Sequence, residues 1–189
     1  MKMKIIGFNA SPRNAGNTAW TINKILEGAK EQGAETEAFH SGKLDINPCK
    51  GCLGCVDSDK CIINDDMQKL YDALKEADAL ILGSPVYMGQ MTAQAKTFTD
   101  RLFAQITPRF SPRFKEENAG KKLVLVWTQG NPNPEMFKEY FDYTKRMFGL
   151  LEFDVTKVQI VAGTRTEPAH EKDGLLPVLK EIGASLVTK

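Results

Sequence analysis

The sequence predicts a doubly wound α/β fold built on a five-stranded parallel sheet. Short apolar runs alternate with stretches whose apolar residues recur at helical spacing, and this alternation repeats five times. The runs at 79–83 and 121–127 are apolar throughout, which is typical of strands buried on both faces. A chain of 189 residues can bury one substantial core and is short for two. We therefore expect residues 1–189 to form one domain.

The first three elements follow from local pattern. The run at 4–8 predicts a buried strand that ends near Asn9. A helix is expected from about Gly16 to Gln32, stopping at Gly33, because glycine suits a helix C-terminus. Polar and apolar residues alternate at 35–40 and indicate a second strand nearer an edge.

A cysteine-rich insert at 47–64 precedes the next helix, which should run from Met67 to Ala77. Asp65 and Asp66 could ligate a metal, but their position favours capping of that helix. The third strand lies at 79–83. The remaining elements keep the alternation: a helix at 92–104, a long loop at 105–120, a strand at 121–127, a helix through Met136 to Phe148, a strand at 153–161 and a helix at 175–186.

Five strands are too few for a closed eight-stranded barrel and suit the flavodoxin-like order 2-1-3-4-5. The result is a three-layer sandwich with helices on both faces of the sheet. In such sheets ligands bind beyond the carboxyl ends of the strands where the winding reverses, here between the first and third strands. The loops after strands one, three and four should therefore meet at one rim.

Composition excludes several classes of function. The formal net charge is +1 with acids and bases interleaved, which argues against a nucleic-acid binder. No apolar run approaches the roughly 18 residues that span a bilayer, and no signal-peptide core follows the N-terminus. We expect a cytoplasmic protein without a membrane partner.

The loop at 9–18 carries the first candidate site. It joins a strand to a helix, where unpaired backbone N–H groups attract phosphate. It holds hydroxyl, amide and guanidinium donors: Ser11, Arg13, Asn17 and Thr18. The alternative is an ordinary turn in which Asn17 or Thr18 caps the helix. The patterns G-x-G-x-x-G and G-x-x-x-x-G-K-[ST] are both absent, so a single phosphate fits better than a dinucleotide.

Two further loops complete the rim. Residues 85–89 would present an apolar and aromatic surface with free N–H groups, and residues 128–131 would present amide donors and acceptors. A flat heterocycle with one apolar and one polar edge needs both kinds of surface. The alternative for 85–89 is a plain tight turn.

Four cysteines are spaced C-x2-C-x2-C-x5-C: Cys49, Cys52, Cys55 and Cys61. Three thiolates at intervals of three can hold one corner of a [4Fe–4S] cluster, and the fourth can close it. Zinc is a second candidate, but structural zinc sites usually take two separated C-x2-C pairs. Metal-free thiols in a reducing compartment are the third. The insert follows the second strand, so it should emerge beside the 9–18 loop.

These motifs together resemble a known family. Ser-Pro-Arg-x-x-Gly-Asn-Thr at 11–18, Ser-Pro-Val-Tyr-x-Gly at 84–89 and the cysteine insert resemble the NAD(P)H-dependent FMN reductase group of the flavodoxin-like superfamily. Within that group they are most similar to the iron–sulfur flavoproteins. The resemblance covers the first two-thirds of the chain.

The resemblance implies roles for particular residues. The FMN phosphate would be held by Ser11, Arg13, Asn17 and Thr18. The isoalloxazine ring would lie beside Pro85, Val86, Tyr87, Met88 and Gly89. The pyrimidine edge of the ring would meet Thr128, Gln129 and Gly130. The cluster ligands would be Cys49, Cys52, Cys55 and Cys61.

The implied function is an FMN-dependent oxidoreductase that passes electrons between a ferredoxin-like or NAD(P)H donor and a small acceptor, with no catalytic side chain. Without a cluster it would be an NAD(P)H-dependent FMN or quinone reductase. A flavodoxin-like carrier is disfavoured because flavodoxins are strongly acidic, and a redox-sensing binding module is a further alternative. The resemblance also implies a homodimer or homotetramer, for which the 105–120 loop is the expected contact.

Other side chains have ordinary explanations. His40 and His170 are isolated and are expected at the surface. Tyr140 and Tyr143 are expected to pack along their helix. Arg109 and Arg113 could reach an anionic cofactor or a neighbouring subunit, although a solvated loop is the default.

Overall fold

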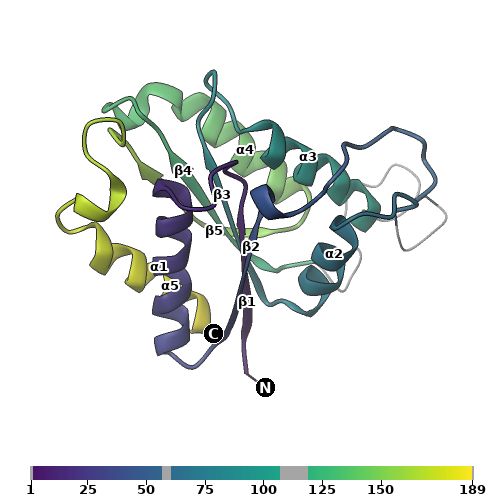
Figure 1. Cartoon of the computed structure of the whole chain (residues 1–189). Helices are drawn as coiled ribbons and strands as arrows, with labels where there is room; N and C mark the ends of the chain where they lie inside the picture. Colours follow the sequence, from purple (N-terminus) through teal and green to yellow (C-terminus); the bar gives the residue numbers. More distant parts are fainter. Residues whose placement is uncertain (1, 57–60, 107–118, 189) are drawn as a thin grey trace.

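The computed structural model describes residues 2–56, 61–106 and 119–188 and contains the predicted parallel sheet. The strands run in the order β2-β1-β3-β4-β5, and every neighbouring pair is parallel (Figure 1). Their bounds are β1 Lys4–Asn9, β2 Glu35–His40, β3 Ala79–Pro85, β4 Lys122–Thr128 and β5 Asp154–Val161. The predicted strand order is confirmed.

Helices cover both faces of the sheet, which gives the predicted three layers (Figure 1). One face carries α1 Asn17–Glu31 and α5 Leu175–Val187. The other carries α2 Met67–Glu76, α3 Ala93–Arg101 and α4 Lys138–Leu150. Four short 3-10 turns lie between these elements in the described chain: η1 Ser41–Lys43, η2 Leu102–Gln105, η3 Pro134–Phe137 and η4 Ala169–Glu171. None of the helices described combines the length and hydrophobicity of a bilayer span.

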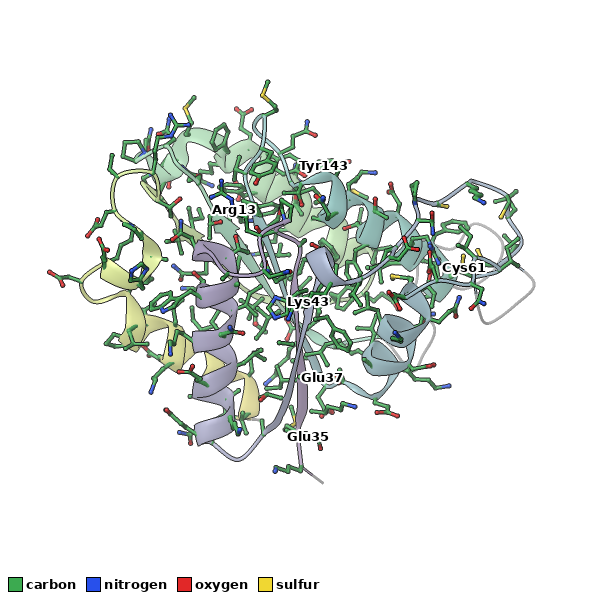
Figure 2. All side chains as sticks on the ribbon, viewed as in Figure 1. Arg13, Glu35, Glu37, Lys43, Cys61 and Tyr143 are labelled. Atoms are coloured by element: carbon green, nitrogen blue, oxygen red, sulfur yellow. The ribbon has the colours of Figure 1, made fainter. Side chains whose placement is uncertain are left out.

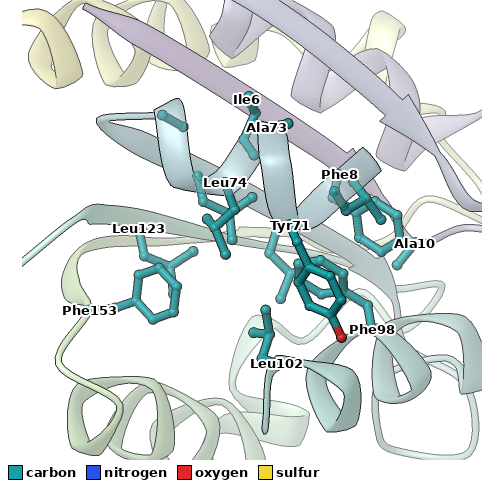
Figure 3. Packing of buried hydrophobic residues seen from close by; sticks show 14 of the residues in the cluster. Ile6, Phe8, Ala10, Tyr71, Ala73, Leu74, Phe98, Leu102, Leu123 and Phe153 are labelled. Atoms are coloured by element: carbon teal, nitrogen blue, oxygen red, sulfur yellow. The ribbon is translucent and has the colours of Figure 1, made fainter. Parts of the chain in front are cut away.

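The central strands bury both of their faces. Ile6 and Leu80 point into a core with α2 and α3, whereas Ile5 and Ile81 point into a second core with α1 and α5. Figure 3 shows the first core, where Phe8 stacks on Phe98 with ring centroids 4.4 Å apart. Burial on both faces explains why the sequence of β3 is a continuous apolar run. The two cores also fix which side chains of each strand point to which face of the sheet.

Several predicted boundaries differ from the observed ones; the helix expected through Met136, for example, begins at Lys138, and Met136 lies in η3. The third strand extends beyond 83 to Pro85, because its pairing with β4 continues until Pro85 lies opposite Thr128. The helix expected at 92–104 ends at Arg101 and tightens into η2, a common ending for a helix. Thr92 is its N-cap, and the Thr92 hydroxyl accepts a hydrogen bond from the backbone of Ala95.

Two glycines let α1 and α5 approach closely. A Cβ at Gly183 would overlap the carbonyl of Ile25 and lie 2.7 Å from the backbone nitrogen of Ala29. A Cβ at Gly28 would overlap the backbone of Lys180. The two helices therefore pack backbone against backbone at this crossing.

Replacing Gly183 by alanine should destabilise the protein by about 1–3 kcal/mol, because the helices must move apart to admit the methyl group. Urea unfolding followed by circular dichroism measures the change. Gly149 in α4 is the matched control, since a Cβ there meets no atom within 4 Å. Gly149→Ala should be neutral or stabilise by up to about 1 kcal/mol through helix propensity. Equal effects of the two substitutions would contradict the close crossing.

Candidate functional site

A cavity of about 920 Å³ opens at the carboxyl ends of β1, β3, β4 and β5. Its walls come from the three predicted loops, from the start of α1 and from the segment after β5. The lining residues are Ser11, Arg13, Asn14, Ala15, Gly16, Asn17, Thr18, Ala19, Trp20, Asn23, Pro85, Val86, Tyr87, Thr128, Gly130, Thr164, Arg165, Pro168 and His170. The rim predicted from parallel topology is thus a real concavity.

Asn9 at the end of β1 shapes the loop that follows. Its carboxamide oxygen accepts from the backbone N–H of Ser11 at 3.1 Å, and its amide nitrogen donates to the carbonyl of Arg13 at 3.2 Å. The Ser11 hydroxyl in turn accepts from the Arg13 N–H at 3.1 Å. Asn9 is buried. The loop is therefore held in one curved conformation from inside the protein.

The start of α1 has no side-chain cap. Gly16 is the N-cap residue, and no side-chain hydrogen bond satisfies the first turn. The alternative in which Asn17 or Thr18 caps this helix is therefore wrong. The first intrahelical bond runs from the N–H of Trp20 to the carbonyl of Gly16, so the N–H groups before it have no partner within the helix. These donors and the positive end of the helix dipole face the cavity.

The side chains of Asn17 and Thr18 hydrogen-bond to other parts of the cavity wall. The Asn17 carboxamide oxygen accepts from the N–H of Ala169 at 2.8 Å, which ties α1 to the segment after β5. The hydroxyl of Thr18 lies 2.7 Å from that of Thr128, and both residues are buried. The helix N–H groups and the exposed Arg13 are among the polar groups that remain at the cavity wall.

The turn after β3 differs from the prediction of free N–H groups. The N–H of Val86 donates to the carbonyl of Thr128, and the N–H of Tyr87 donates to the carbonyl of Gln90. Met88 and Gly89 both have positive φ and form the tip of this turn. Met88 is fully exposed, and neither tip residue lines the cavity. Of the five residues predicted here, Pro85, Val86 and Tyr87 line it.

Part of the loop after β4 makes hydrogen bonds within the loop itself. Thr128 and Gly130 line the cavity, but Gln129 is buried behind them. The Gln129 side-chain nitrogen donates to the carbonyls of Asn131 and Asn133 at 3.1 and 2.7 Å. Gln129 thus shapes the loop, and its side-chain oxygen is buried without a partner among the described residues.

The wall after β5 was missed from the sequence. The cavity is also lined by Thr164, Arg165, Pro168 and His170. The carboxyl end of β5 lies at the same edge of the sheet as those of β1, β3 and β4. Topology was the available signal, but the segment carries no recognisable motif.

The two histidines behave differently. His170 is exposed, as predicted, at the mouth of the cavity. His40 is half-buried, so the prediction of a surface residue is wrong for it. Its Nδ1 accepts from the side-chain amide of Asn9 at 3.2 Å. Burial, helped by nearby Lys43, lowers the pKa of His40, which favours the neutral ring that this hydrogen bond requires.

The cysteines lie away from the cavity. The segment that leads from β2 to the cysteines contacts the 9–18 loop at its start, where the Ser41 hydroxyl donates to the carbonyl of Ser11 at 3.0 Å. Figure 2 shows Cys61 beside α2 and α3, well apart from Arg13. None of the four cysteines lines the cavity. The contact is made by Ser41, which precedes the insert at 47–64, and the thiols lie elsewhere, so the expectation that the cysteines emerge beside the loop is wrong.

The four thiols have the right chemistry for iron or zinc, but no three of them lie close enough to share a metal ion. Cys49 and Cys52 are exposed, Cys55 and Cys61 are half-buried, and all four are free. Within residues 2–56, 61–106 and 119–188, no three Cys, His, Asp or Glu side chains are close enough to hold a metal ion. Burial and the neighbouring Cys61 raise the pKa of the Cys55 thiol. The donor set fits a metal centre, while the spacing of the sulfur atoms does not yet form one.

The two aspartates before α2 have separate partners. The N-cap position of α2 is Asp66, whose side chain makes no cap hydrogen bond, whereas the Asp65 carboxylate accepts from the N–H of Met67, the first residue of the helix, at 3.0 Å. Asp66 makes no such bond to the helix, and its carboxylate accepts from the backbone of Asp45 instead. Asp65 also forms a buried ion pair with Arg101, which the sequence did not predict.

The remaining predictions divide. Tyr140 packs against Trp127 with ring centroids 5.6 Å apart, as expected. Tyr143 is 52% exposed, so packing is wrong for it. Arg109 and Arg113 lie outside the described residues.

Comparison with known proteins gives a consistent result. Residues 3–135 match the family described as NADPH-dependent FMN reductase. An iron–sulfur flavoprotein of Methanocaldococcus jannaschii is 44% identical over 99 residues, which cover 52% of this chain and 51% of that protein. One of Archaeoglobus fulgidus is 34% identical over 149 residues, covering 79% of this chain and 65% of that protein. The chain spans about half the length of most curated relatives it matches.

Solved structures share the fold. The NAD(P)H:quinone oxidoreductase from Methanothermobacter marburgensis has a TM-score of 0.75 at 15% identity, over 100% of this chain and 99% of that one. An FMN-dependent NADH-azoreductase from Bacillus anthracis, solved with FMN, has a TM-score of 0.68 at 16% identity, over 98% of this chain and 100% of that one. At these identities the likeness is one of fold.

Acid should destabilise the protein through Asp65. Burial alone would raise the pKa of Asp65, but hydrogen bonds from Arg101, Asn47 and Met67 outweigh it and hold that pKa below its ordinary value. The resulting stability is present above about pH 4 and is lost as the pH falls through the lowered folded pKa. Asp65→Asn should cost about 3–5 kcal/mol at pH 7, because Arg101 stays buried without its counter-charge. Its unfolding free energy should then fall less steeply with acid than that of the wild type.

Urea unfolding between pH 7 and pH 3 measures both effects. Asp142→Asn is the control, because Asp142 pairs with Lys138 at 2.6 Å on an exposed helix face. Solvent screens that pair, so its loss should change stability little. Parallel pH curves for Asp65→Asn and the wild type would contradict the role given to Asp65.

Proposed function

The chain belongs to the NADPH-dependent FMN reductase family, and from this membership we propose that it is an FMN-dependent oxidoreductase of the iron–sulfur flavoprotein type. It would pass electrons from NAD(P)H or a ferredoxin-like donor to a small acceptor. The observation that carries the proposal is the uncapped start of α1, which opens into a cavity of about 920 Å³. That cavity has a cationic end and an aromatic wall, as a phosphorylated flat heterocycle requires.

The FMN phosphate would sit at the start of α1. Backbone N–H groups and the helix dipole favour an anion there, and Arg13 would add a charge-assisted hydrogen bond. Ser11 can donate its hydroxyl while accepting from Arg13. Asn17 and Thr18 would act through the wall, since their side chains are bound to Ala169 and Thr128.

The isoalloxazine ring would lie along the far wall. Pro85, Val86 and Tyr87 line that wall, and Tyr87 is 47% exposed, so its ring has a free face. Thr128 and Gly130 would meet the polar edge of the flavin, with Gln129 fixing their loop. Met88 and Gly89 would set the turn without touching the ring.

Bound FMN would supply the redox chemistry, because a flavin takes a hydride and can release electrons singly. The protein's own residues would hold the phosphate, orient the ring and limit the access of water. No side-chain acid or base is assigned.

We further propose that the four cysteines ligate a [4Fe–4S] cluster, Cys49, Cys52, Cys55 and Cys61 being its ligands. The names of the relatives and the thiol donor set support this. The alternative, a cluster-free NAD(P)H-dependent FMN or quinone reductase, is favoured by the ungathered thiols. Residues 1–189 would act as one domain in a homodimer or homotetramer. The contact predicted at 105–120 falls mainly outside the described residues.

Anaerobic purification followed by a visible spectrum and by flavin, iron and zinc analysis tests the cofactors. We expect flavin absorption and iron near four per chain. Flavin without iron would exclude the cluster and support the cluster-free reductase. A protein that binds no FMN would contradict the whole proposal. Oxidation of NAD(P)H by the pure protein separates an enzyme from a carrier.

Arg13→Ala should weaken FMN binding roughly tenfold, which corresponds to about 1.4 kcal/mol, because a cationic phosphate partner is lost. Riboflavin lacks the phosphate, so its affinity should change little. Quenching of flavin fluorescence on titration measures both dissociation constants. The control is Arg146→Ala, an exposed arginine of α4 outside the cavity lining. Equal losses for FMN and riboflavin would show that Arg13 does not read the phosphate.

A further inference from the structure

Arg101 and Asp65 form a buried ion pair at the base of the cysteine segment, by which we mean residues 47–56 and 61–64. The Arg101 Nη1 atom lies 2.7 Å from Asp65 Oδ2, and Nη2 lies 3.1 Å from Asp65 Oδ1. The two side chains are 0% and 2% exposed. Arg101 is the last residue of α3, a helix that packs on the sheet. Through this pair, α3 holds Asp65, which directly follows the cysteine segment.

The pair makes hydrogen bonds to both ends of the cysteine segment. At the upstream end, Arg101 Nη1 donates to the carbonyl of Asn47 at 2.8 Å, and the Asn47 N–H donates to Asp65 at 2.9 Å. At the downstream end, Arg101 Nη2 lies 3.4 Å from the carbonyl of Ile63. Gln68 adds a second hold, since its side-chain nitrogen donates to the carbonyls of Cys61 and Ile63 at 3.0 and 2.8 Å.

A backbone bridge lies just outside these contacts. The N–H of Asp66 donates to the carbonyl of Asp45 at 3.0 Å, and the N–H of Asp45 donates to the Asp66 carboxylate at 2.8 Å. The segment therefore begins and ends at one closed base. Among residues 49–56 and Cys61, the contact with that base is the hydrogen bond from Gln68 to the carbonyl of Cys61.

The other end of α3 is fixed to the cavity loops. The Thr92 hydroxyl donates to the carbonyl of Ala10 at 2.7 Å, and the Thr92 N–H donates to the hydroxyl of Ser84 at 3.0 Å. Ala10 lies in the 9–18 loop, and Ser84 lies near the end of β3. One helix of nine residues thus joins the rim of the cavity to the base of the cysteine segment.

A buried ion pair is a costly way to obtain stability alone. Its desolvation can exceed its Coulombic gain, and well-packed apolar side chains often do as well or better. What the pair adds is direction, because a guanidinium fork and a carboxylate fit each other in few geometries. The further donors that converge on Asp65, from Asn47 and Met67, increase that selectivity.

We propose that Arg101 and Asp65 are positioning residues for the four thiols: they close the cysteine segment and set its placement relative to α3. Nothing in this role requires flavin. It rests on the proposed function only in treating the thiols as ligands of a metal centre.

Residue-resolved alkylation of the reduced, metal-free protein tests the role. In the wild type, iodoacetamide should modify the exposed Cys49 and Cys52 faster than the half-buried Cys55 and Cys61. In Asp65→Asn and Arg101→Met the base opens locally, so the rates for Cys55 and Cys61 should rise at least about fivefold and approach the other two. Mass spectrometry of the peptides gives each rate.

Amide hydrogen exchange separates positioning from general destabilisation. In both variants the lower global stability speeds exchange in β1 and α1 as well, so positioning predicts a rise in peptides containing Asn47 and Ile63 that is clearly larger than the rise in β1 and α1. Arg101→Lys keeps the charge without the fork and should behave like Arg101→Met. Asp100→Asn is the matched control, because it removes the exposed pair with Lys96 one residue away on the same helix. It should leave all four alkylation rates unchanged.

Two results would overturn the proposal. One is a folded Asp65→Asn or Arg101→Lys protein whose four thiols react at wild-type rates. The other is a rise in exchange that is equal in β1, α1 and the cysteine segment, which would make the pair a general stabiliser. Failure of the wild type to bind FMN would sink the proposed function and leave this test intact.

Discussion

The pairing of β1 with β3 is the constraint on which the site depends. Asn9 lies opposite Gly83, and the N–H of Ala10 donates to the carbonyl of Gly83 at 2.8 Å. The chain leaves both strands at this edge, where the winding of the sheet reverses. Because all five strands are parallel, the loops that follow β4 and β5 begin at this same edge. The cavity follows from topology, and its chemistry follows from the loops.

The helix α3 gives the molecule its second organising element. Its N-cap residue, Thr92, donates a hydrogen bond to the carbonyl of Ala10, and its last residue, Arg101, is paired with Asp65. The cavity and the cysteine segment are therefore not independent attachments to the sheet. A displacement of either one would have to bend α3 or break a buried contact at one of its ends. This explains how a segment outside the sheet can keep a defined place.

The fold was predictable because its signals are local. Buried strands such as 79–83 are apolar throughout, and their spacing leaves room for one helix each. The site was predictable only in part. Asn17 looks like a helix cap, but the structure uses its side chain to bind Ala169, 152 positions away. The Arg101–Asp65 pair likewise joins residues 36 positions apart. No pattern along the chain encodes such partners.

The central claim is that the open start of α1 receives the phosphate of FMN. Amide hydrogen exchange of residues 11–19 tests it directly, because this segment contains the N–H groups at the start of α1 that would be the phosphate donors. With saturating FMN, exchange in this segment should slow strongly, and with saturating riboflavin it should slow much less. Slowing by FMN at the 85–87 wall with none in residues 11–19 would contradict the account.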